Sequence, residues 1–257
     1  MRKEEILPIF KSYYVYRENM IKKTGEYMRE FKAIFFDRDN TLTKNNPEMD
    51  LELHRRYKEL SKVDLNIPYK RFIKFFNKVM EQDKPYIPYK TIEDELLFFI
   101  DFYELLLIDD GVTEDVRNKA NYLGEKLWYV YKKPFEETVE VLEYFFNKGY
   151  IMGVISDCPP SLKYSLELIG LSKFFTSFTA SSIVGVGKPN PIIYQYALDV
   201  EGVKAEDCLY VDDTLDEADG ARSMGFTSFH IDRKGNQNKT EWTISNLKEI
   251  IEFVESQ

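Results

Sequence analysis

Short apolar segments alternate with longer segments of helical periodicity in the second half of the chain. Runs rich in β-forming residues occur at about 32–37, 151–155, 174–179, 208–211 and 226–231. Helical spacing of apolar positions is found at 136–148, 161–169, 191–200 and 215–224, and a last helix is expected to open at Ser245. Strands that alternate with helices of about 10–15 residues are typical of βαβ units. The pattern therefore predicts an α/β fold with a Rossmann-like parallel sheet.

Residues 46–133 have a different pattern and contain no convincing strand. Apolar side chains recur there at helical spacing, as at Phe72, Phe75, Phe76 and Val79. Thr91 followed by Asp94 indicates the start of another helix, and 113–131 is a further helical candidate. Because aromatic side chains dominate buried area, we expect the many aromatic residues of this segment to form its core rather than a substrate pocket.

These patterns divide the chain into three parts. Residues 31–45 and 134–257 are expected to form the α/β core. Residues 46–133 are expected to form an all-helical domain inserted between the first and second strands. Residues 1–30 carry scattered apolar residues among many charges, and we expect an N-terminal helical extension there, to which we assign no role.

Composition narrows the class of protein. The 257 residues carry a formal net charge of −9, which argues against a nucleic acid or an anionic membrane as partner. The two cysteines, Cys158 and Cys208, lie far apart and indicate a reducing compartment rather than a disulfide framework. The N-terminus lacks the apolar core of a signal peptide, and the most apolar stretch, 96–108, is too short to span a bilayer. We expect a soluble cytoplasmic protein.

The first apolar run ends at two acidic residues, Asp37 and Asp39. A buried strand that stops at two carboxylates delivers them to its carboxyl end, where open α/β sheets place their ligands. Two carboxylates so close repel each other unless a cation lies between them, and Mg²⁺ prefers oxygen ligands. Taken alone, the segment is equally consistent with a strand that runs into an Asp/Asn turn.

Three later segments strengthen the functional interpretation. The strand at 151–155 ends at Ser156 and Asp157, where a hydroxyl can donate to a phosphate oxygen. Lys188 precedes a helix that Pro191 opens, a position suited to an anion because the helix N-terminus carries positive partial charge. The strand at 208–211 ends at the adjacent carboxylates Asp212 and Asp213. Beside the first acidic pair, these would complete an oxygen cage for a divalent cation.

In order and type, the four segments resemble the haloacid-dehalogenase-like (HAD) hydrolase superfamily. The resemblance is dense over 31–45 and 134–232 and weak over 46–133, where a helical insert looks like the cap domain of that family. It implies that Asp37 is the nucleophile and Asp39 the general acid and base. It also implies a substrate-binding set and a Mg²⁺-binding set. The substrate-binding residues would be Thr41, Ser156, Asp157 and Lys188, and the metal ligands Asp37, Asp39 (through its backbone carbonyl), Asp212 and Asp213.

The presence of Asp39 helps to distinguish between the reactions known in this superfamily. Dehalogenases of this superfamily lack it, because no leaving oxygen needs a proton, so Asp39 favours phosphoryl transfer. The resemblance thus implies a phosphatase that acts on a small phosphorylated metabolite. A phosphomutase of the β-phosphoglucomutase type keeps the same residues, and a phospho-acceptor signalling switch and an inactive binding module on this fold are weaker alternatives.

Two positions depart from the family or vary within it. Asn40 stands where the family usually has glycine, and asparagine tolerates a left-handed backbone best among the alternatives to glycine. Arg38 occupies a variable position and is expected to face the entrance of the site. The role of Asp216 stays open, and the sequence does not identify the substrate.

Overall fold

The structure is a computed structural model that describes residues 31–80, 89–235 and 239–257. Its centre is a parallel sheet of six strands in the order β5-β4-β1-β6-β7-β8. The strands are β1 (Ala33–Phe36), β4 (Ile151–Ser156), β5 (Ser177–Ala180), β6 (Cys208–Asp212), β7 (Thr227–Ile231) and β8 (Thr243–Ile244). The predicted α/β fold with a parallel sheet is confirmed. The predicted extension at 1–30 lies outside the described residues.

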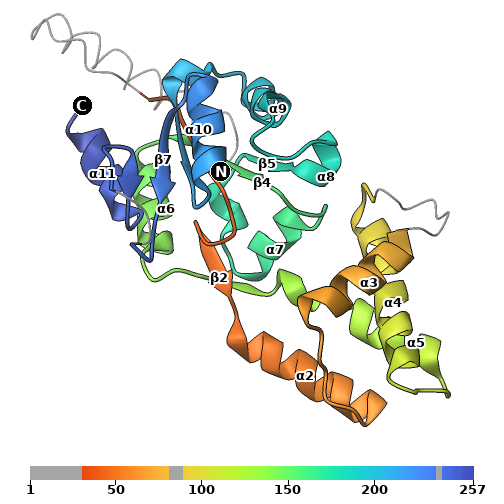
Figure 1. Cartoon of the computed structure of the whole chain (residues 1–257). Coiled ribbons are helices and arrows are strands. Elements are labelled where there is room, and N and C mark those ends of the chain that lie inside the picture. Colours follow the sequence, from red (N-terminus) through yellow and green to blue (C-terminus); the bar gives the residue numbers. More distant parts are fainter. Residues whose placement is uncertain (1–30, 81–88, 236–238) are drawn as a thin grey trace, which may run out of the picture.

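Helices cover both faces of the sheet (Figure 1). They are α6 (Thr138–Asn147), α7 (Leu162–Leu168), α8 (Ser181–Val184), α9 (Pro191–Glu201), α10 (Leu215–Ser223) and α11 (Lys248–Glu255), with short 3₁₀ turns η2 (Ser172–Phe174) and η3 (Ala205–Asp207). Buried residues of α6, α7 and α11 belong to one apolar cluster, and those of α9 and α10 belong to another. The sheet is therefore the middle layer of three.

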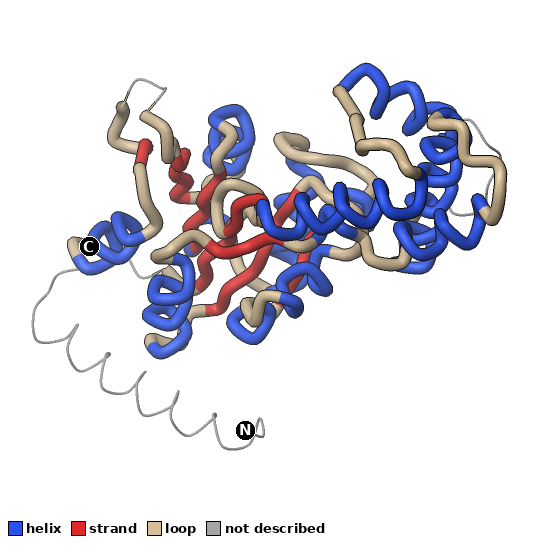
Figure 2. Tube along the Cα trace, turned by 90° about the horizontal axis from the view of Figure 1, so that it is seen from below, coloured by secondary structure: helices blue, strands red, loops and turns tan. Residues whose placement is uncertain are grey.

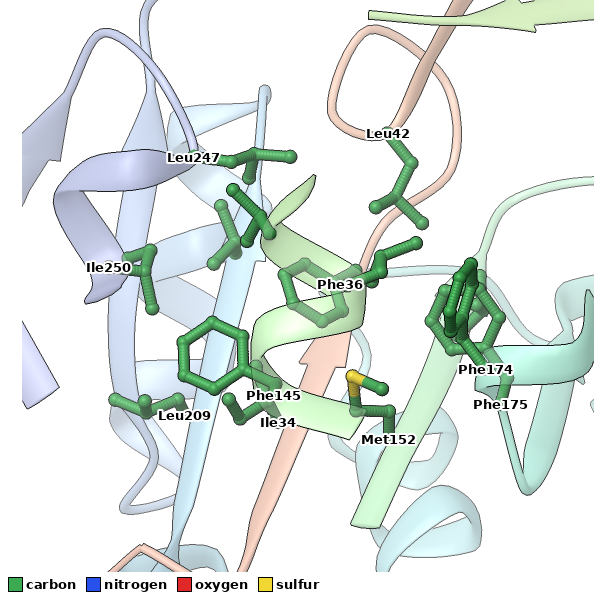
Figure 3. Close-up of a cluster of buried hydrophobic side chains, with 14 of the residues drawn as sticks. Ile34, Phe36, Leu42, Phe145, Met152, Phe174, Phe175, Leu209, Leu247 and Ile250 are labelled. Carbon is green, nitrogen blue, oxygen red and sulfur yellow. The ribbon is translucent and has the colours of Figure 1, made fainter. Parts of the chain in front are cut away.

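The central strand β1 is buried on both sides, because its side chains alternate between these clusters. Ile34 and Phe36 pack in the cluster of α6 and α11, whereas Ala33 and Phe35 pack in the cluster of α9. Figure 3 shows Phe36 and Ile34 beside Phe145 of α6. Burial on both faces explains why this strand reads as a continuous apolar run in the sequence.

A helical lobe is inserted between two short strands, β2 (Thr43–Asn45) and β3 (Lys132–Pro134), which pair antiparallel. It consists of α2 (Pro47–Ser61), α3 (Tyr69–Met80), α4 (Ile92–Asp109), α5 (Val116–Gly124) and the 3₁₀ turn η1 (Trp128–Val130). Its buried residues form an apolar cluster of their own. Figures 1 and 2 both show this lobe to one side of the sheet.

The aromatic residues of the insert lie mainly in that cluster. Phe75 and Phe98 are buried there, and Phe72 and Phe76 pack against it. The expectation that they form the core of the insert is confirmed for these residues. Phe76 also lines a cavity between the insert and the core.

Some element boundaries differ from the sequence prediction. The helix expected over 113–131 is shorter, because α5 ends at Gly124 and a 3₁₀ turn follows. The last helix does not open at Ser245: the backbone N–H and hydroxyl of Ser245 both donate to Glu249, and α11 begins at Lys248. Within the described residues, no helix is long and apolar enough to cross a membrane.

Candidate active site

Three neighbouring strand ends bring the predicted residues together. Because β1 lies between β4 and β6, their carboxyl ends meet at one edge of the sheet. Asp37 follows β1 directly, and its backbone N–H donates to the carbonyl of Val211. Ser156 is the last residue of β4 and Asp212 the last of β6, and both are buried. The parallel topology alone therefore gathers side chains that lie far apart in the sequence.

Lys188 is the cation at the centre of this edge. Its Nζ atom lies 2.8 Å from Oδ1 of Asp37, 2.7 Å from Oδ2 of Asp212 and 2.7 Å from Oε2 of Glu217. The lysine is held just ahead of α9, where Pro191 occupies the first turn, as the sequence predicts, and the side chain of Asn190 caps the helix. With only three ammonium protons, Lys188 has one for each of the three carboxylates.

Glu217 is a site residue that the sequence analysis missed. It lies in the first turn of α10, five residues after Asp212, and faces Lys188. The start of α10 directly after a strand end was a usable signal, because a helix turns its first-turn side chains back toward its N-terminus. Asp216, beside it, is exposed.

Burial shapes the electrostatics of the acidic group. It raises the pKa of Asp37 to about 7 and that of Asp212 to about 6, although the charge of Lys188 opposes both shifts. Burial also raises the pKa of Asp213. The single ammonium of Lys188 therefore does not neutralise all the carboxylates at this edge of the sheet.

The same group has the composition of a divalent-cation site. Asp37, Asp212 and Asp213 each offer a carboxylate oxygen, and these oxygens lie within 4.8 Å of one another. Oδ2 of Asp37 is buried and has no hydrogen-bond partner among the described residues. A buried carboxylate oxygen without a donor is costly unless a cation contacts it. The donor set, all oxygen, fits Mg²⁺.

Asp39 lies apart from these three carboxylates, with its side chain paired to cations. Nε and Nη2 of Arg38 each lie 3.0 Å from one of its carboxylate oxygens, and Nζ of Lys132 lies 3.6 Å away. Burial opposes ionisation of Asp39, but Arg38 lowers its pKa overall. Arg38 does not face the entrance as expected: it is 3% exposed, and its Nη1 donates to the hydroxyl of Ser165 on α7.

Three further predicted residues lie around this group. Asn40 has a φ of 59°, the left-handed conformation expected where the family usually has glycine, and its side-chain amide donates to Asp213. The hydroxyl of Thr41 is buried without a hydrogen-bond partner among the described residues. Asp157 accepts a hydrogen bond from the backbone N–H of Lys188, so it holds the lysine loop. Any Cβ at Gly187 would lie within 3.0 Å of that carboxylate.

A cavity of about 480 Å³ lies beside the carboxylates, between the insert and the core. Its wall includes Asp157 and Gly187, next to Ser156 and Lys188, but not Asp37 itself. Residues of the insert and of the loops after β4 and β5 form the lining: Phe76, Met80, Tyr89, Lys90, Cys158, Pro159, Ser181, Ser182, Gly185 and Val186. The cavity therefore borders the residues that are expected to hold a phosphoryl group.

Comparison with known proteins identifies relatives of known class. Residues 31–225 match the family described as haloacid dehalogenase-like hydrolase. The chain is 26% identical over 233 residues to a glyceraldehyde 3-phosphate phosphatase of Methanocaldococcus jannaschii, and the alignment covers 88% of this chain and 97% of that protein. It is 27% identical over 164 residues to (S)-2-haloacid dehalogenase 4A of Burkholderia cepacia, and that alignment covers 59% of this chain and 70% of the dehalogenase.

Solved structures share the fold. A HAD phosphatase from Thermococcus onnurineus aligns with a TM-score of 0.58 at 24% identity, over 87% of this chain and 97% of that one. A 2-haloacid dehalogenase from Pseudomonas syringae aligns with a TM-score of 0.63 at 19% identity, over 88% and 98%. At these identities the likeness concerns the fold, and the reaction has to be argued from the side chains.

Proposed function

Because this chain belongs to the haloacid dehalogenase-like hydrolase family, we propose that it is a Mg²⁺-dependent phosphatase of a small phosphorylated metabolite. The observation that carries the proposal is the contact between Asp37 and Lys188, with Asp39 two residues beyond. A carboxylate approaches a phosphate dianion only if nearby cations offset their charges. Lys188 supplies one positive charge at the nucleophile, and a metal bound by Asp37, Asp212 and Asp213 would supply more.

The reaction we propose has two steps. Oδ2 of Asp37, which has no hydrogen-bond partner among the described residues, attacks phosphorus while the ester P–O bond breaks. Asp39 gives a proton to the leaving oxygen from its protonated form, which is the minor form while Arg38 lowers its pKa. Asp39, then ionised, takes a proton from water, whose oxygen attacks phosphorus and releases inorganic phosphate from Asp37. Two steps are each easier than one direct transfer. Bound Mg²⁺ would neutralise charge on the phosphoryl oxygens.

Ser156, Lys188 and Thr41 are proposed to bind the phosphoryl oxygens. Ser156 is buried at the end of β4, and the buried Thr41 hydroxyl lacks a partner among the described residues. A hydroxyl left without a partner is available to an incoming oxygen. For Asp157 the proposal is narrower: its contact with the Lys188 backbone supports a role in holding the binding loop.

Phosphatase chemistry is favoured over dehalogenation by Asp39, since a halide leaving group needs no proton. A phosphomutase would keep every residue named here. It is distinguished from a phosphatase by its product, which is an isomeric phosphate ester rather than inorganic phosphate. Relatives named glyceraldehyde 3-phosphate phosphatase make triose phosphates the first substrates to test. We also propose a cytoplasmic location, supported by Cys158 and Cys208, which are both unpaired.

We propose further that 46–133 acts as a cap on a core of 31–45 and 134–257. Separate apolar clusters in the insert and the core support this division. The paired strands β2 and β3 mark the place where the chain leaves and re-enters the core.

The test is phosphate release from p-nitrophenyl phosphate and from glyceraldehyde 3-phosphate, with Mg²⁺ and with EDTA. We expect turnover with Mg²⁺ and a loss of at least about 100-fold with EDTA, the range for removing a principal catalytic group. Activity that is equal with and without the chelator would contradict the metal dependence, and formation of an isomeric ester would favour the mutase.

A further inference from the structure

Glu95 of the insert is completely buried against the core. The residue lies in the first turn of α4 and is 0% exposed. Its Oε2 accepts a hydrogen bond of 2.9 Å from the backbone N–H of Ser161, and its Oε1 accepts one of 2.8 Å from the Ser161 hydroxyl. Ser161 immediately precedes α7 in the core, so one carboxylate joins the two lobes.

Burial at this position is energetically unfavourable for an ionised carboxylate. Burying a charged group costs more than a neutral one, and the described residues place no cation in hydrogen-bonding contact with Glu95. The charged and titratable groups that face it are Arg38, Tyr89 and, through Tyr89, Cys158. Burial raises the pKa of Glu95 to about 7, against the opposing effects of Ser161 and Arg38.

The segment that Glu95 holds is the continuation of the expected phosphate-binding strand end. The chain runs from Ser156, through the cavity-lining Cys158 and Pro159, to Ser161. A second contact lies in the cavity wall: Nζ of Lys90 donates to the carbonyl of Ser182, in the segment after β5. Lys90 and Glu95 therefore anchor the start of α4 to the core at two points.

We propose that Glu95 is a positioning residue that docks the insert on the core and thereby holds the loop between β4 and α7 in its substrate-binding conformation. The part of this proposal that concerns substrate rests on the phosphatase function proposed above. The docking itself does not, because it concerns only the contact between Glu95 and Ser161.

The docked arrangement has a kinetic consequence. If substrate binds only the docked state, its apparent affinity falls in proportion to the docked fraction. Loss of two hydrogen bonds to a charged acceptor is large enough to reduce that fraction about 10-fold or more. Saturating substrate restores the docked state, so KM rises while kcat changes little. A residue that merely supports folding would instead lower the active fraction, and hence kcat, at constant KM.

The experiment combines hydrogen–deuterium exchange with steady-state kinetics on the full chain, using p-nitrophenyl phosphate and Mg²⁺. For Glu95→Ala we expect amide exchange over 157–165 to quicken about 10-fold, while the α4 segment 98–107 keeps its protection. KM should rise about 10-fold with kcat within about 2-fold. Glu93→Ala, which removes an exposed carboxylate two residues away, is the matched control and should change neither.

Two further variants keep the test decisive if Glu95→Ala folds poorly. Glu95→Gln can still accept from the Ser161 N–H and donate to its hydroxyl, so it should retain low KM and slow exchange. Ser161→Ala removes one of the two hydrogen bonds from the core side and should give an intermediate change. Unchanged exchange over 157–165 in both Glu95→Ala and Ser161→Ala would overturn the docking role.

An unchanged KM despite faster exchange would overturn the link to substrate binding. If the wild-type protein hydrolyses no phosphate ester, the proposed function fails, whereas the exchange measurement still decides whether Glu95 docks the insert.

Discussion

Nζ of Lys188 lies 2.8 Å from Oδ1 of Asp37, although 151 residues separate the two in the chain. The contact exists because the chain returns to the same edge of a parallel sheet after each helix. It places the positive charge of the Lys188 ammonium beside one oxygen of the proposed nucleophile. The other oxygen, Oδ2, has no hydrogen-bond partner among the described residues. Substitutions at this pair and around it should therefore have separate and measurable effects.

Replacing Asp37 by asparagine should abolish phosphatase activity. An amide cannot attack phosphorus, so kcat should fall by more than about 100-fold. The measurement is phosphate release from p-nitrophenyl phosphate with Mg²⁺. Asp64→Asn removes an exposed carboxylate of the insert and should leave kcat unchanged. Undiminished turnover of Asp37→Asn, with the same circular dichroism spectrum as wild type, would refute the nucleophile.

Asp39→Asn should affect poor leaving groups more than good ones. The substitution removes the proton donor and leaves Asp37 in place. Aryl phosphates need little protonation of the leaving oxygen, so the substitution should slow their phosphorylation step less than that of alkyl phosphates. The rate loss for alkyl phosphates should exceed the loss for aryl phosphates by at least about 10-fold. Single-turnover kinetics of p-nitrophenyl phosphate and glycerol phosphate on the same variant provide the comparison. Equal losses for both would count against the acid role.

Glu95 should make stability depend on pH. Its folded pKa, about 7, is raised above the ordinary value of 4.5, so the folded state binds the proton more tightly than the unfolded state. The resulting stabilisation is complete below about pH 4.5 and is lost as pH rises through about 7. At about 1.4 kcal/mol for each pKa unit, the change amounts to roughly 3 kcal/mol.

Urea unfolding of wild type and Glu95→Gln at pH 5 and pH 8 measures this effect. Glutamine resembles the protonated acid, so the variant should match wild type at pH 5 and be more stable at pH 8. Glu93→Gln, at an exposed position, controls for general changes in charge. A difference between wild type and Glu95→Gln that is the same at both pH values would show that Glu95 titrates normally.

The parallel sheet could be predicted because its central strands β1, β4 and β6 are short apolar runs that end at a polar residue. Local signals also indicated Thr91 as a helix cap, and the structure has the expected capping box of Thr91 and Asp94. Helix α2 was missed because seven of its fifteen residues are charged, which obscures a narrow apolar stripe of Met49, Leu53, Tyr57 and Leu60. Its start at Asn46 and Pro47 was nevertheless a readable signal.

The short strands escaped prediction for a different reason. β2, β3 and β8 contain two or three residues each, and β3 is Lys-Lys-Pro. Such segments carry no periodicity, and they become strands only because a partner lies beside them. Sequence patterns record how a segment is buried, and none of these segments has more than one buried residue, Thr43 in β2 and Ile244 in β8.

In the site, residues at strand ends were predictable and those reached through tertiary contacts were not. Asp37, Ser156 and Asp212 follow apolar runs, so topology alone places them together. Arg38 was expected to face the entrance, but its guanidinium is buried and donates to the hydroxyl of Ser165, 127 residues away. Nothing in the sequence of α4 reveals that Ser161 covers Glu95.

The paired strands β2 and β3 provide a way to remove the insert. Asn45 lies opposite Lys132 in the register, so replacing 46–131 by an Asn-Gly turn would close a two-residue hairpin without moving the core. The core keeps its own apolar clusters and should fold. Without the insert, the cavity beside the site loses the part of its wall that Phe76, Met80, Tyr89 and Lys90 form, so water can enter.

We expect the shortened protein to hydrolyse small aryl phosphates but to lose discrimination among metabolites. Closing a lid over a site excludes water and selects substrates by contacts that form only on closure. The measurement is the spread of kcat/KM over a panel of phosphate esters, for the intact and the shortened protein, each checked by circular dichroism. The spread should contract by about 10-fold or more, since a pocket contact is worth roughly that factor in discrimination. A folded, shortened protein with an unchanged spread would place specificity in the core, and the insert would then need another role.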